Sequence, residues 1–257
     1  MLKARQELTA PTRTLRLASG DQIPAHRHDD HQIVYAGRGV LAVTTDRGSW
    51  VAPATRAIWI PAGTLHAHRA YGELKLHTVG LAAADNPLRL DSPTVLTVGP
   101  LLRELIIAYT AVDADTPERS RLRAVLLDQL RGSPQQPLHV PTPTAPLLAA
   151  VCDILQADPG DGRTLAELGR VVGASERSLS RLFRQDLGMT FPQWRTQLRL
   201  HRALILLAER TPVTTVAHQC GWSSASAFIE VFRRSFGHTP GASTRSENFE
   251  SDVPQAN

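Results

Sequence analysis

The chain has 257 residues, 42% of them hydrophobic, which is enough material for two cores of ordinary domain size. No apolar run approaches the ~18 residues of a membrane span, and the N-terminus lacks a hydrophobic signal segment, so we expect a cytoplasmic protein with no membrane partner. The 28 basic and 24 acidic side chains leave a net charge of +4, which permits a nucleic-acid partner without establishing one.

The two cysteines, Cys152 and Cys220, lie in unrelated segments without CxxC or His/Cys spacing. We therefore predict neither a disulfide framework nor a structural zinc site, and we interpret both as small buried apolar residues. The cationic side chains are nearly all arginine, with lysine only at Lys3 and Lys75. This bias fits either codon usage or selection for phosphate and guanine contacts.

Short β-branched and aromatic runs, bounded by glycine and proline, fill the segment from Leu15 to about Leu96. The clearest runs are QIVYAG, GVLAVTT, GSWVAP and RAIWIPAG. Such runs are typical of an antiparallel barrel or sandwich. We therefore predict an N-terminal β domain over residues 1–98.

Histidines are concentrated in this predicted β domain. The segment GDQIPAHRHDDHQIVYAGRG contains His26, His28, Gln32 and Gly39, and the segment PAGTLH ends on His66. The two segments resemble the two motifs of the cupin fold, with Gln32 in the place of a carboxylate. His26 and His28 alternate onto one face of a strand, and by the resemblance His66 comes from an opposite strand, so three imidazoles could converge inside the barrel. The cluster could hold a divalent metal ion or an effector; alternatively, it lines a pocket or the core.

Two departures from the cupin motifs argue against catalysis. Gln32 is a neutral amide and a weaker metal ligand than glutamate, and Thr55 stands where the second motif opens with glycine. The resemblance to sensory cupins implies a barrel that serves as a ligand pocket. We therefore predict that the protein is not an enzyme.

The effector pocket should have an apolar wall with a few polar groups. We expect Tyr35 and Trp59 to line this pocket together with one of the histidines. We place His31 and His68 on the outer face of the barrel or at a strand end. The identity of the effector cannot be predicted from these residues.

Residues 99–146 form a predicted connector. In LLRELIIAYTAV and PERSRLRAVLLDQL the apolar residues recur three and four positions apart, which predicts two amphipathic helices between Pro100 and Leu130. Their apolar faces need a partner, and we expect them to contribute to a homodimer or to couple the two domains. The following stretch, RGSPQQPLHVPTPTAP, contains five prolines, which exclude a helix interior and a central strand. We interpret it as the interdomain linker.

The segment TLAELGRVVGASERSLSRLFRQDLG has the sequence pattern of a helix-turn-helix unit. Gly173 can end the first helix in the left-handed conformation, and Ser175 can cap the second helix. The second helix directs Leu179, Leu182 and Phe183 inward and keeps polar side chains on its outer face. Arginines and small polar residues on such a face suit a major groove of DNA.

The same pattern recurs in PVTTVAHQCGWSSASAFIEVFRRSFG, with a turn at Gly221 and a helix cap at Ser223 or Ser224. The second helix of this unit buries phenylalanines and keeps polar residues outside. Between the two units, FPQWRTQLRLHRALILLAE begins with Pro192 at a helix N-terminus and predicts a long connecting helix.

These segments resemble the AraC/XylS family of transcription regulators, over about Leu147 to Arg245. The matching blocks are GASERSLSRLFRQDLGMTF, RLHRAL and VAHQCGWSSASAFIEVFRRSFGHTP. The resemblance implies an all-α DNA-binding domain over residues 147–246 with seven helices, in which the second helix of each unit enters a major groove. Ser243 departs from the tyrosine usual in the family, and residues 247–257 are predicted to form a flexible tail.

The resemblance also assigns candidate DNA-contacting residues to the second helix of each unit. They are Ser175, Arg177, Ser178, Ser180, Arg181 and Arg184 in the first unit, and Ser224, Ala225, Ser226, Ile229, Glu230 and Arg233 in the second. Ala225 and Ile229 can offer only apolar contact, for example to thymine methyl groups. Arg199, Arg202 and Arg234 are further candidates for phosphate contacts.

The predicted fold class is α+β with two domains: an N-terminal cupin-like β-barrel, a helical connector, and a C-terminal all-α domain with two helix-turn-helix units. The predicted function is a sequence-specific DNA-binding transcription regulator, activator or repressor, that responds to a small-molecule or metal signal in the barrel. The implied partners are double-stranded DNA, the effector, a second copy of the chain and RNA polymerase. Two alternatives are a constitutive DNA-binding regulator whose barrel serves only assembly, and a metallocupin enzyme.

Overall fold

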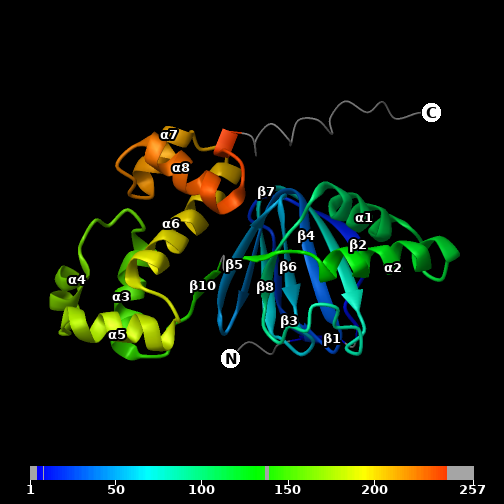
Figure 1. Cartoon of the computed structure of the whole chain (residues 1–257), viewed down its shortest axis with the longest axis horizontal. Helices are drawn as coiled ribbons and strands as arrows, with labels where there is room; N and C mark the ends of the chain where they lie inside the picture. Colours follow the sequence, from blue (N-terminus) through cyan, green and yellow to red (C-terminus); the bar gives the residue numbers. More distant parts are fainter. Residues whose placement is uncertain (1–4, 8, 137–138, 242–257) are drawn as a thin grey trace. The chain divides into compact units, whose positions relative to one another are not determined.

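The computed structural model of the chain describes residues 5–7, 9–136 and 139–241 (Figure 1). Its internal contacts divide the chain into two units. Residues up to 138, apart from 47–49, form the first unit, and residues 47–49 with those from 139 onward form the second. The predicted tail at 247–257 and the departure at Ser243 lie outside the described residues.

The N-terminal unit is built on one antiparallel-rich sheet. Its strands are β1 (Arg5–Glu7), β2 (Arg13–Leu17), β3 (Gln22–His28), β4 (His31–Thr45), β5 (Gly48–Pro53), β6 (Arg56–Ile60), β7 (His66–Leu81), β8 (Thr94–Thr97) and β9 (Gln135–Gln136); β10 (His139–Pro141) follows. The strands pair in the order β1-β3-β7-β4-β6-β8-β9, with β2 also on β7 and β5 on β4. Among the described strands no pairing joins β1 to β9, so the predicted barrel is a sheet without a closed ring of strand pairs.

The sheet has two apolar faces because side chains alternate along each strand. One face carries Val34, Ile58 and Leu76 in a cluster of strand residues. The opposite face carries Ile33 and Trp59, which pack with buried residues of two helices. Both faces are buried, which explains why β4 and β6 are nearly continuous runs of buried residues.

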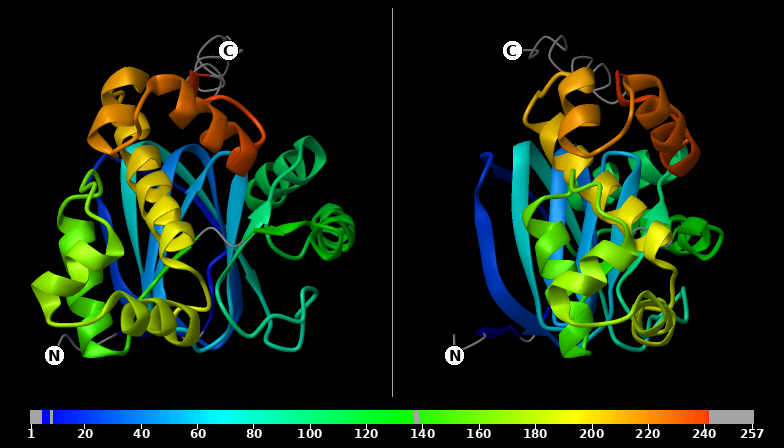
Figure 2. Two further views of the ribbon diagram at one scale, coloured as in Figure 1. Left: turned by 60° about the vertical axis from the view of Figure 1, so that its left-hand side comes forward. Right: turned by 90° about the vertical axis from the view of Figure 1, so that its left-hand side faces the viewer.

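The two helices on this face are α1 (Pro100–Ala111) and α2 (Pro117–Arg131), which lie beside the sheet in Figures 1 and 2. Both begin with proline, and the side chain of Thr116 caps α2 by accepting a hydrogen bond from the backbone N–H of Arg119. The predicted amphipathic helices are confirmed, and their apolar faces pack on the sheet. In the structure they therefore group with the N-terminal unit.

The C-terminal unit is helical. Its described helices are α3 (Pro146–Ala157), α4 (Leu165–Val172), α5 (Glu176–Asp186), α6 (Phe191–Ala208), α7 (Val213–Gln219) and α8 (Ala225–Phe236). Helical backbone begins again at residues 240–241, where the described part of the chain ends. Helices α4 and α5 form the first helix-turn-helix unit, α7 and α8 form the second, and α6 connects them.

Local sequence explains where these helices begin and end. Gly173 ends α4 in the left-handed conformation with φ +72°, as predicted. The predicted caps are also confirmed, since the side chain of Ser175 accepts a hydrogen bond from the N–H of Ser178, and that of Ser224 accepts one from the N–H of Ala227. Of the two candidates for the second cap, the structure selects Ser224.

A single core holds the first helix-turn-helix unit against α3 and α6. Leu179 and Phe183 from α5 are fully buried against Trp194 of α6, as their helical spacing predicts. Cys152 of α3 lies in the same cluster, and both Cys152 and Cys220 are free and buried, which confirms their interpretation as small core residues.

Candidate functional site

The outer face of α5 carries exposed arginines one turn apart. Arg177, Arg181 and Arg184 are all exposed, whereas Leu179 and Phe183 on the opposite face are buried. The arginines border a hollow of about 720 Å³ that is also lined by Ser178, Ser180 and Gln185. Apart from Gln185, every lining residue is among the predicted DNA contacts. Gln185 follows Arg181 by four residues and so lies on the same face of the helix; this spacing could have predicted it as a further DNA contact.

Ser175 has a structural role. Its hydroxyl caps α5 and lies 2.9 Å from the hydroxyl of Ser178. Because its hydroxyl oxygen accepts a hydrogen bond from the backbone N–H of Ser178, Ser175 orients the first turn of α5, where Arg177 begins the exposed face. Its direct contact with DNA stays a prediction.

The outer face of α8 is chemically different from that of α5. Ser226, Glu230 and Arg233 are exposed, and Ala225 and Ile229 are half-buried. Glu230 forms an ion pair of 3.0 Å with Arg234, both side chains being more than 70% exposed. Because the guanidinium of Arg234 offsets the negative charge of Glu230, α8 repels a phosphate backbone less than it would with Glu230 unpaired.

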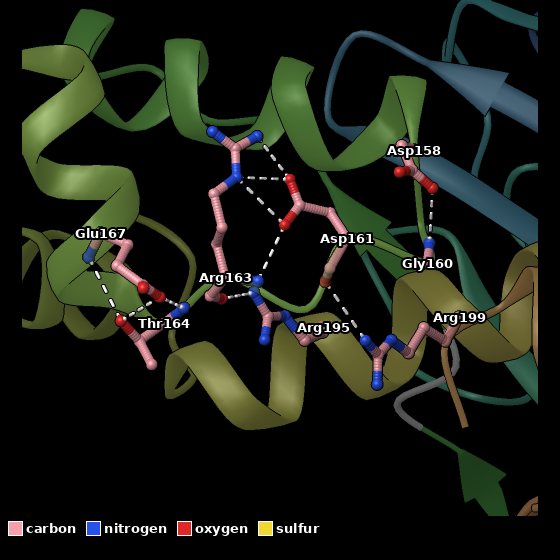
Figure 3. A network of polar contacts seen from close by, with 8 residues as sticks. All are labelled: Asp158, Gly160, Asp161, Arg163, Thr164, Glu167, Arg195 and Arg199. Carbon is pink, nitrogen blue, oxygen red and sulfur yellow. Dashed lines mark hydrogen bonds and ion pairs between the residues drawn. The ribbon is translucent and has the colours of Figure 1, made fainter. Parts of the chain in front are cut away.

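Arg199 was predicted as a phosphate contact, and the structure corrects this. Its guanidinium is half-buried and donates hydrogen bonds to the backbone carbonyl of Pro159, at 3.0 Å, and to that of Asp161, at 3.3 Å. Figure 3 shows the bond to Asp161. Arg195 donates in the same way to the carbonyl of Arg163. Burial lowers the pKa of both arginines from their usual value. They join α6 to the loop between α3 and α4, whereas Arg202 is exposed.

Three histidines of the sheet come together as predicted. His26 on β3 is the register partner of His66 on β7, and His28 lies two residues further along β3. One ring nitrogen from each of the three lies within 4.8 Å of those of the others, and all three side chains are buried. The ring centroids of His26 and His66 are 4.4 Å apart.

Hydrogen bonds orient each of the three rings. The Nδ1 atoms of His26, His28 and His66 lie 2.8, 3.0 and 2.8 Å from the carbonyl oxygens of Pro24, Asp30 and Thr64. Because a carbonyl only accepts, each Nδ1 must donate, which leaves the Nε2 lone pair of a neutral ring free. Within the described structure, the buried Nε2 atoms of His28 and His66 have no hydrogen-bond partner.

This arrangement fits a metal ion. Histidines that bind metals usually donate their second ring N–H to a carbonyl or carboxylate, which is the pattern seen at all three rings. Burial, together with the neighbouring imidazoles, lowers the pKa of His66 to about 4, so its ring is neutral near pH 7 and available as a ligand. Buried nitrogens that lack a partner are costly, and a bound ion would satisfy them.

Two further buried side chains of the N-terminal unit have polar atoms without a hydrogen-bond partner among the described residues. Gln32 is only 2% exposed, lies on the same face of β4 as Val34, and its Oε1 has no hydrogen-bond partner among the described residues. His68 follows His66 by two residues on β7, and its ring centroid lies 5.0 Å from that of His66. Both ring nitrogens of His68 are buried without a partner.

His31 lies at a strand end, as predicted, because it is the first residue of β4, and its side chain is buried. The predicted position of His68 was wrong, since it lies inside β7 and is buried. His31 is satisfied, because its Nδ1 accepts from the N–H of Ala62 and its Nε2 lies 3.1 Å from the carbonyl of Ala83. It is therefore a core histidine. His68 shares the face of His66 because residues two apart in a strand point the same way.

Tyr35 and Trp59 lie on the other face of the sheet. Both belong to the cluster under α1 and α2, separate from the cluster on the face of Val34. The hydroxyl of Tyr35 donates to the carbonyl of Ala54, and the indole N–H of Trp59 donates to that of Leu90. The structure places these two residues apart from His26, His28 and His66, with the ring of Trp59 4.8 Å from that of His31 and the ring of Tyr35 6.1 Å from that of His77. Their role in an effector pocket stays a prediction.

Two helix-turn-helix units with an exposed arginine face point to a DNA-binding protein, and the sheet that carries the buried histidine cluster belongs to a separate unit. Comparison with known proteins agrees. A helix-turn-helix domain model matches residues 168–246, and a cupin domain model matches residues 13–80. Within the residues that the structure describes, no helix has the length and apolar character needed to span a membrane.

Relatives of known class extend this result to most of the chain. The HTH-type transcriptional regulator NimR of Escherichia coli (strain K12) is 33% identical over 224 residues, covering 85% of this chain and 81% of NimR. RipA of Corynebacterium glutamicum is 35% identical over 109 residues, covering 41% of this chain and 33% of RipA. A crystal structure of an AraC-type transcriptional regulator from Chromobacterium violaceum is 28% identical, covers 40% of this chain and 94% of that chain, and has a TM-score of 0.38.

The chain therefore belongs to the AraC/XylS family of HTH-type transcriptional regulators, with a cupin domain at its N-terminal side. It is a DNA-binding regulator, and these relatives are named as HTH-type transcriptional regulators.

Proposed function

We propose that this regulator senses a divalent metal ion, bound by His26, His28 and His66, and that the ion changes its affinity for operator DNA. The proposal is carried by two observations: one ring nitrogen from each of the three histidines lies within 4.8 Å of those of the others, and each Nδ1 donates to a carbonyl, which leaves an Nε2 lone pair on each neutral ring to bind an ion. Imidazole ligands favour zinc, copper, nickel, cobalt and iron(II) over magnesium and calcium. The bound ion would supply a positive charge that pulls the three rings into one fixed arrangement.

Operator recognition is assigned to α5 and α8. Arg177 and Arg181 on α5 have the length and donor geometry to contact guanine in a major groove. Ser226 and Ile229 on α8 suit a less polar half-site that includes thymine methyl groups. Two recognition helices in successive major grooves predict half-sites about 10 bp apart.

Sensing requires that the ion bind one functional state of the regulator more tightly than the other, since equal affinity for both shifts nothing. Because the sensor acts through DNA binding, we place the protein with the chromosome in the cytoplasm. Self-association through α1 and α2, and contact with RNA polymerase, stay predictions from the family resemblance.

The metal site is tested by metal content. The full chain, stripped with a chelator and then incubated with zinc or cobalt(II) and desalted, should retain about one ion per chain. His28→Phe keeps a planar ring but removes the ligand, and should lose the ion. His218→Phe is the matched control because His218 is exposed on α7, far from the cluster in sequence, and should retain it. Equal metal content in all three proteins would refute the site.

The DNA-reading face is tested by fluorescence anisotropy with DNA from beside the protein's own gene, at fixed salt. Arg181→Ala should weaken specific binding by about ten- to a hundredfold, since a bidentate arginine–guanine pair contributes about 1–3 kcal/mol of discrimination. Arg121→Ala, which removes an exposed arginine from α2, is the matched control and should bind normally. If Arg181→Ala bound this DNA as tightly as the wild type and Arg121→Ala do, the assignment of α5 would be contradicted.

A further inference from the structure

The proposed metal site lacks a negative charge. Among the described residues, His26, His28 and His66 form this cluster without a neighbouring Asp, Glu or Cys ligand. Gln32, at the place of the cupin carboxylate, is a neutral amide. A divalent ion bound by three neutral imidazoles therefore keeps its full charge in a buried position, and burying an uncompensated charge is strongly unfavourable.

His68 supplies a second, independent observation. It is 3% exposed, and its ring lies 5.0 Å from that of His66 and 5.6 Å from that of His26. Both of its nitrogens are without a hydrogen-bond partner in the described structure. A neutral imidazole always carries one N–H, so His68 holds an unused donor beside the three ligands. Native proteins rarely leave such a donor buried and unsatisfied unless a ligand or water uses it.

We infer that the ligand completing this site is a small anion, which binds the metal ion and accepts a hydrogen bond from His68. The inference rests on the proposed metal site and names the class of its co-ligand. An anion balances the charge that the three imidazoles leave uncompensated, and it accepts the hydrogen bond that His68 offers. The ligand is small because all four histidines are buried. The signal read by the regulator is then the metal ion together with the anion.

The test uses the full chain loaded with cobalt(II), whose visible absorption reports its ligands. Acetate is the probe and acetamide is its control, because the two have the same shape and differ in charge. Acetate should change the cobalt spectrum in a saturable way, and acetamide should not. A spectrum that responds to neither, with cobalt bound, would overturn the inference while leaving the metal site intact. Absence of bound cobalt would overturn both.

Two variants test the role of His68. His68→Phe retains a ring of similar shape and removes the donor, so it should weaken acetate binding by about tenfold or more, as expected for a hydrogen bond to a charged group. Its cobalt affinity should stay within about threefold, since His68 is not among the three ligands. His68→Gln restores an N–H donor and should recover much of the acetate affinity. Equal acetate affinity in the wild type and both variants would show that His68 does not bind the anion.

Discussion

At the scale of single residues, the most informative change is to replace the neutral Gln32 with a charged residue. Gln32→Glu should tighten metal binding by about tenfold or more, because a carboxylate adds Coulomb attraction that the buried amide lacks. The same variant should reduce the response of the cobalt spectrum to acetate, since the charge is then balanced within the protein. Competition with a chelating dye measures the affinity. Gln32→Met is the neutral control, and a gain in that variant as well would contradict the electrostatic explanation.

The two cysteines give a prediction on reactivity. Burial raises the pKa of Cys152 to about 12 and that of Cys220 to about 11. Since the thiolate is the reactive form, iodoacetamide at pH 8 should label both at least about a hundredfold more slowly in the native protein than in urea. Mass spectrometry over time follows the labelling. Rapid alkylation of the native protein would show that these side chains are accessible.

The residues of the histidine cluster were only partly predictable from sequence. The spacing of His26 and His28 and the PAGTLH segment were enough to bring three imidazoles together. His68 could also have been predicted, because it is two residues from His66 in the same strand. Tyr35 could in the same way have been placed on the opposite face of the sheet from Gln32, since it lies an odd number of residues from it. What the sequence did not show is that both faces of the sheet are buried, so burial alone did not mark the pocket side.

At the scale of elements, the two turn glycines make a matched pair. Gly173 and Gly221 both have positive φ, +72° and +76°. A Cβ at Gly173 would have open space around it, whereas one at Gly221 would lie 2.6 Å from Nη2 of Arg199 and 2.9 Å from the carbonyl oxygen of Gly160. Gly173→Ala should therefore cost only the left-handed strain, about 1–2 kcal/mol, and Gly221→Ala distinctly more. Urea unfolding measures both free energies. Equal losses would mean that the contact at Gly221 relaxes without cost.

Asp186, the last residue of α5, links the start of α3 to the first helix-turn-helix unit through hydrogen bonds. The carboxylate of Asp186 accepts hydrogen bonds from the N–H and hydroxyl of Thr144 and from the N–H of Ala145, at 2.6 to 2.9 Å. These bonds lower the pKa of Asp186 below its usual value of 3.8. The carboxylate therefore stabilises the folded state above about pH 4, and this contribution is lost as the pH falls through the lowered pKa.

Asp186→Asn should accordingly reduce the free energy of unfolding at pH 7 and make the loss of stability below pH 4 less steep. Urea unfolding between pH 7 and pH 2.5 measures this dependence. Asp153→Asn, at an exposed position on α3, is the control and should follow the wild type. A wild-type pH profile for Asp186→Asn would show that these hydrogen bonds contribute little.

Helix boundaries were well predicted because caps and turn glycines act locally, as at Ser175 and Gly173. The role of Arg199 was not predictable. Its acceptors are carbonyls 38 and 40 residues away in the loop between α3 and α4, and nothing local to α6 distinguishes it from an exposed arginine. Long-range contacts of this kind depend on how the helices pack.

At the scale of the whole molecule, composition and periodicity separated a β-rich N-terminal part from a helical C-terminal part, and the structure divides the chain at the same stretch. The two amphipathic helices α1 and α2 were predicted from their periodicity, but the surface that covers them was not, because an apolar face does not show which surface will cover it. That surface is the face of the sheet that carries Ile33 and Trp59. The duplicated turn pattern predicted two helix-turn-helix units because each is encoded by local signals.

The measurement that tests the central claim most directly is the affinity of the full chain for its operator, with and without zinc, in the wild type and in His66→Phe. We predict that zinc changes the wild-type dissociation constant by about 5- to 150-fold, the usual range of coupling between two sites, and that His66→Phe binds DNA like the metal-free wild type whether or not zinc is present. An operator affinity indifferent to zinc in a wild type that retains the ion would contradict the account, and would leave a DNA-binding regulator that acts without this signal.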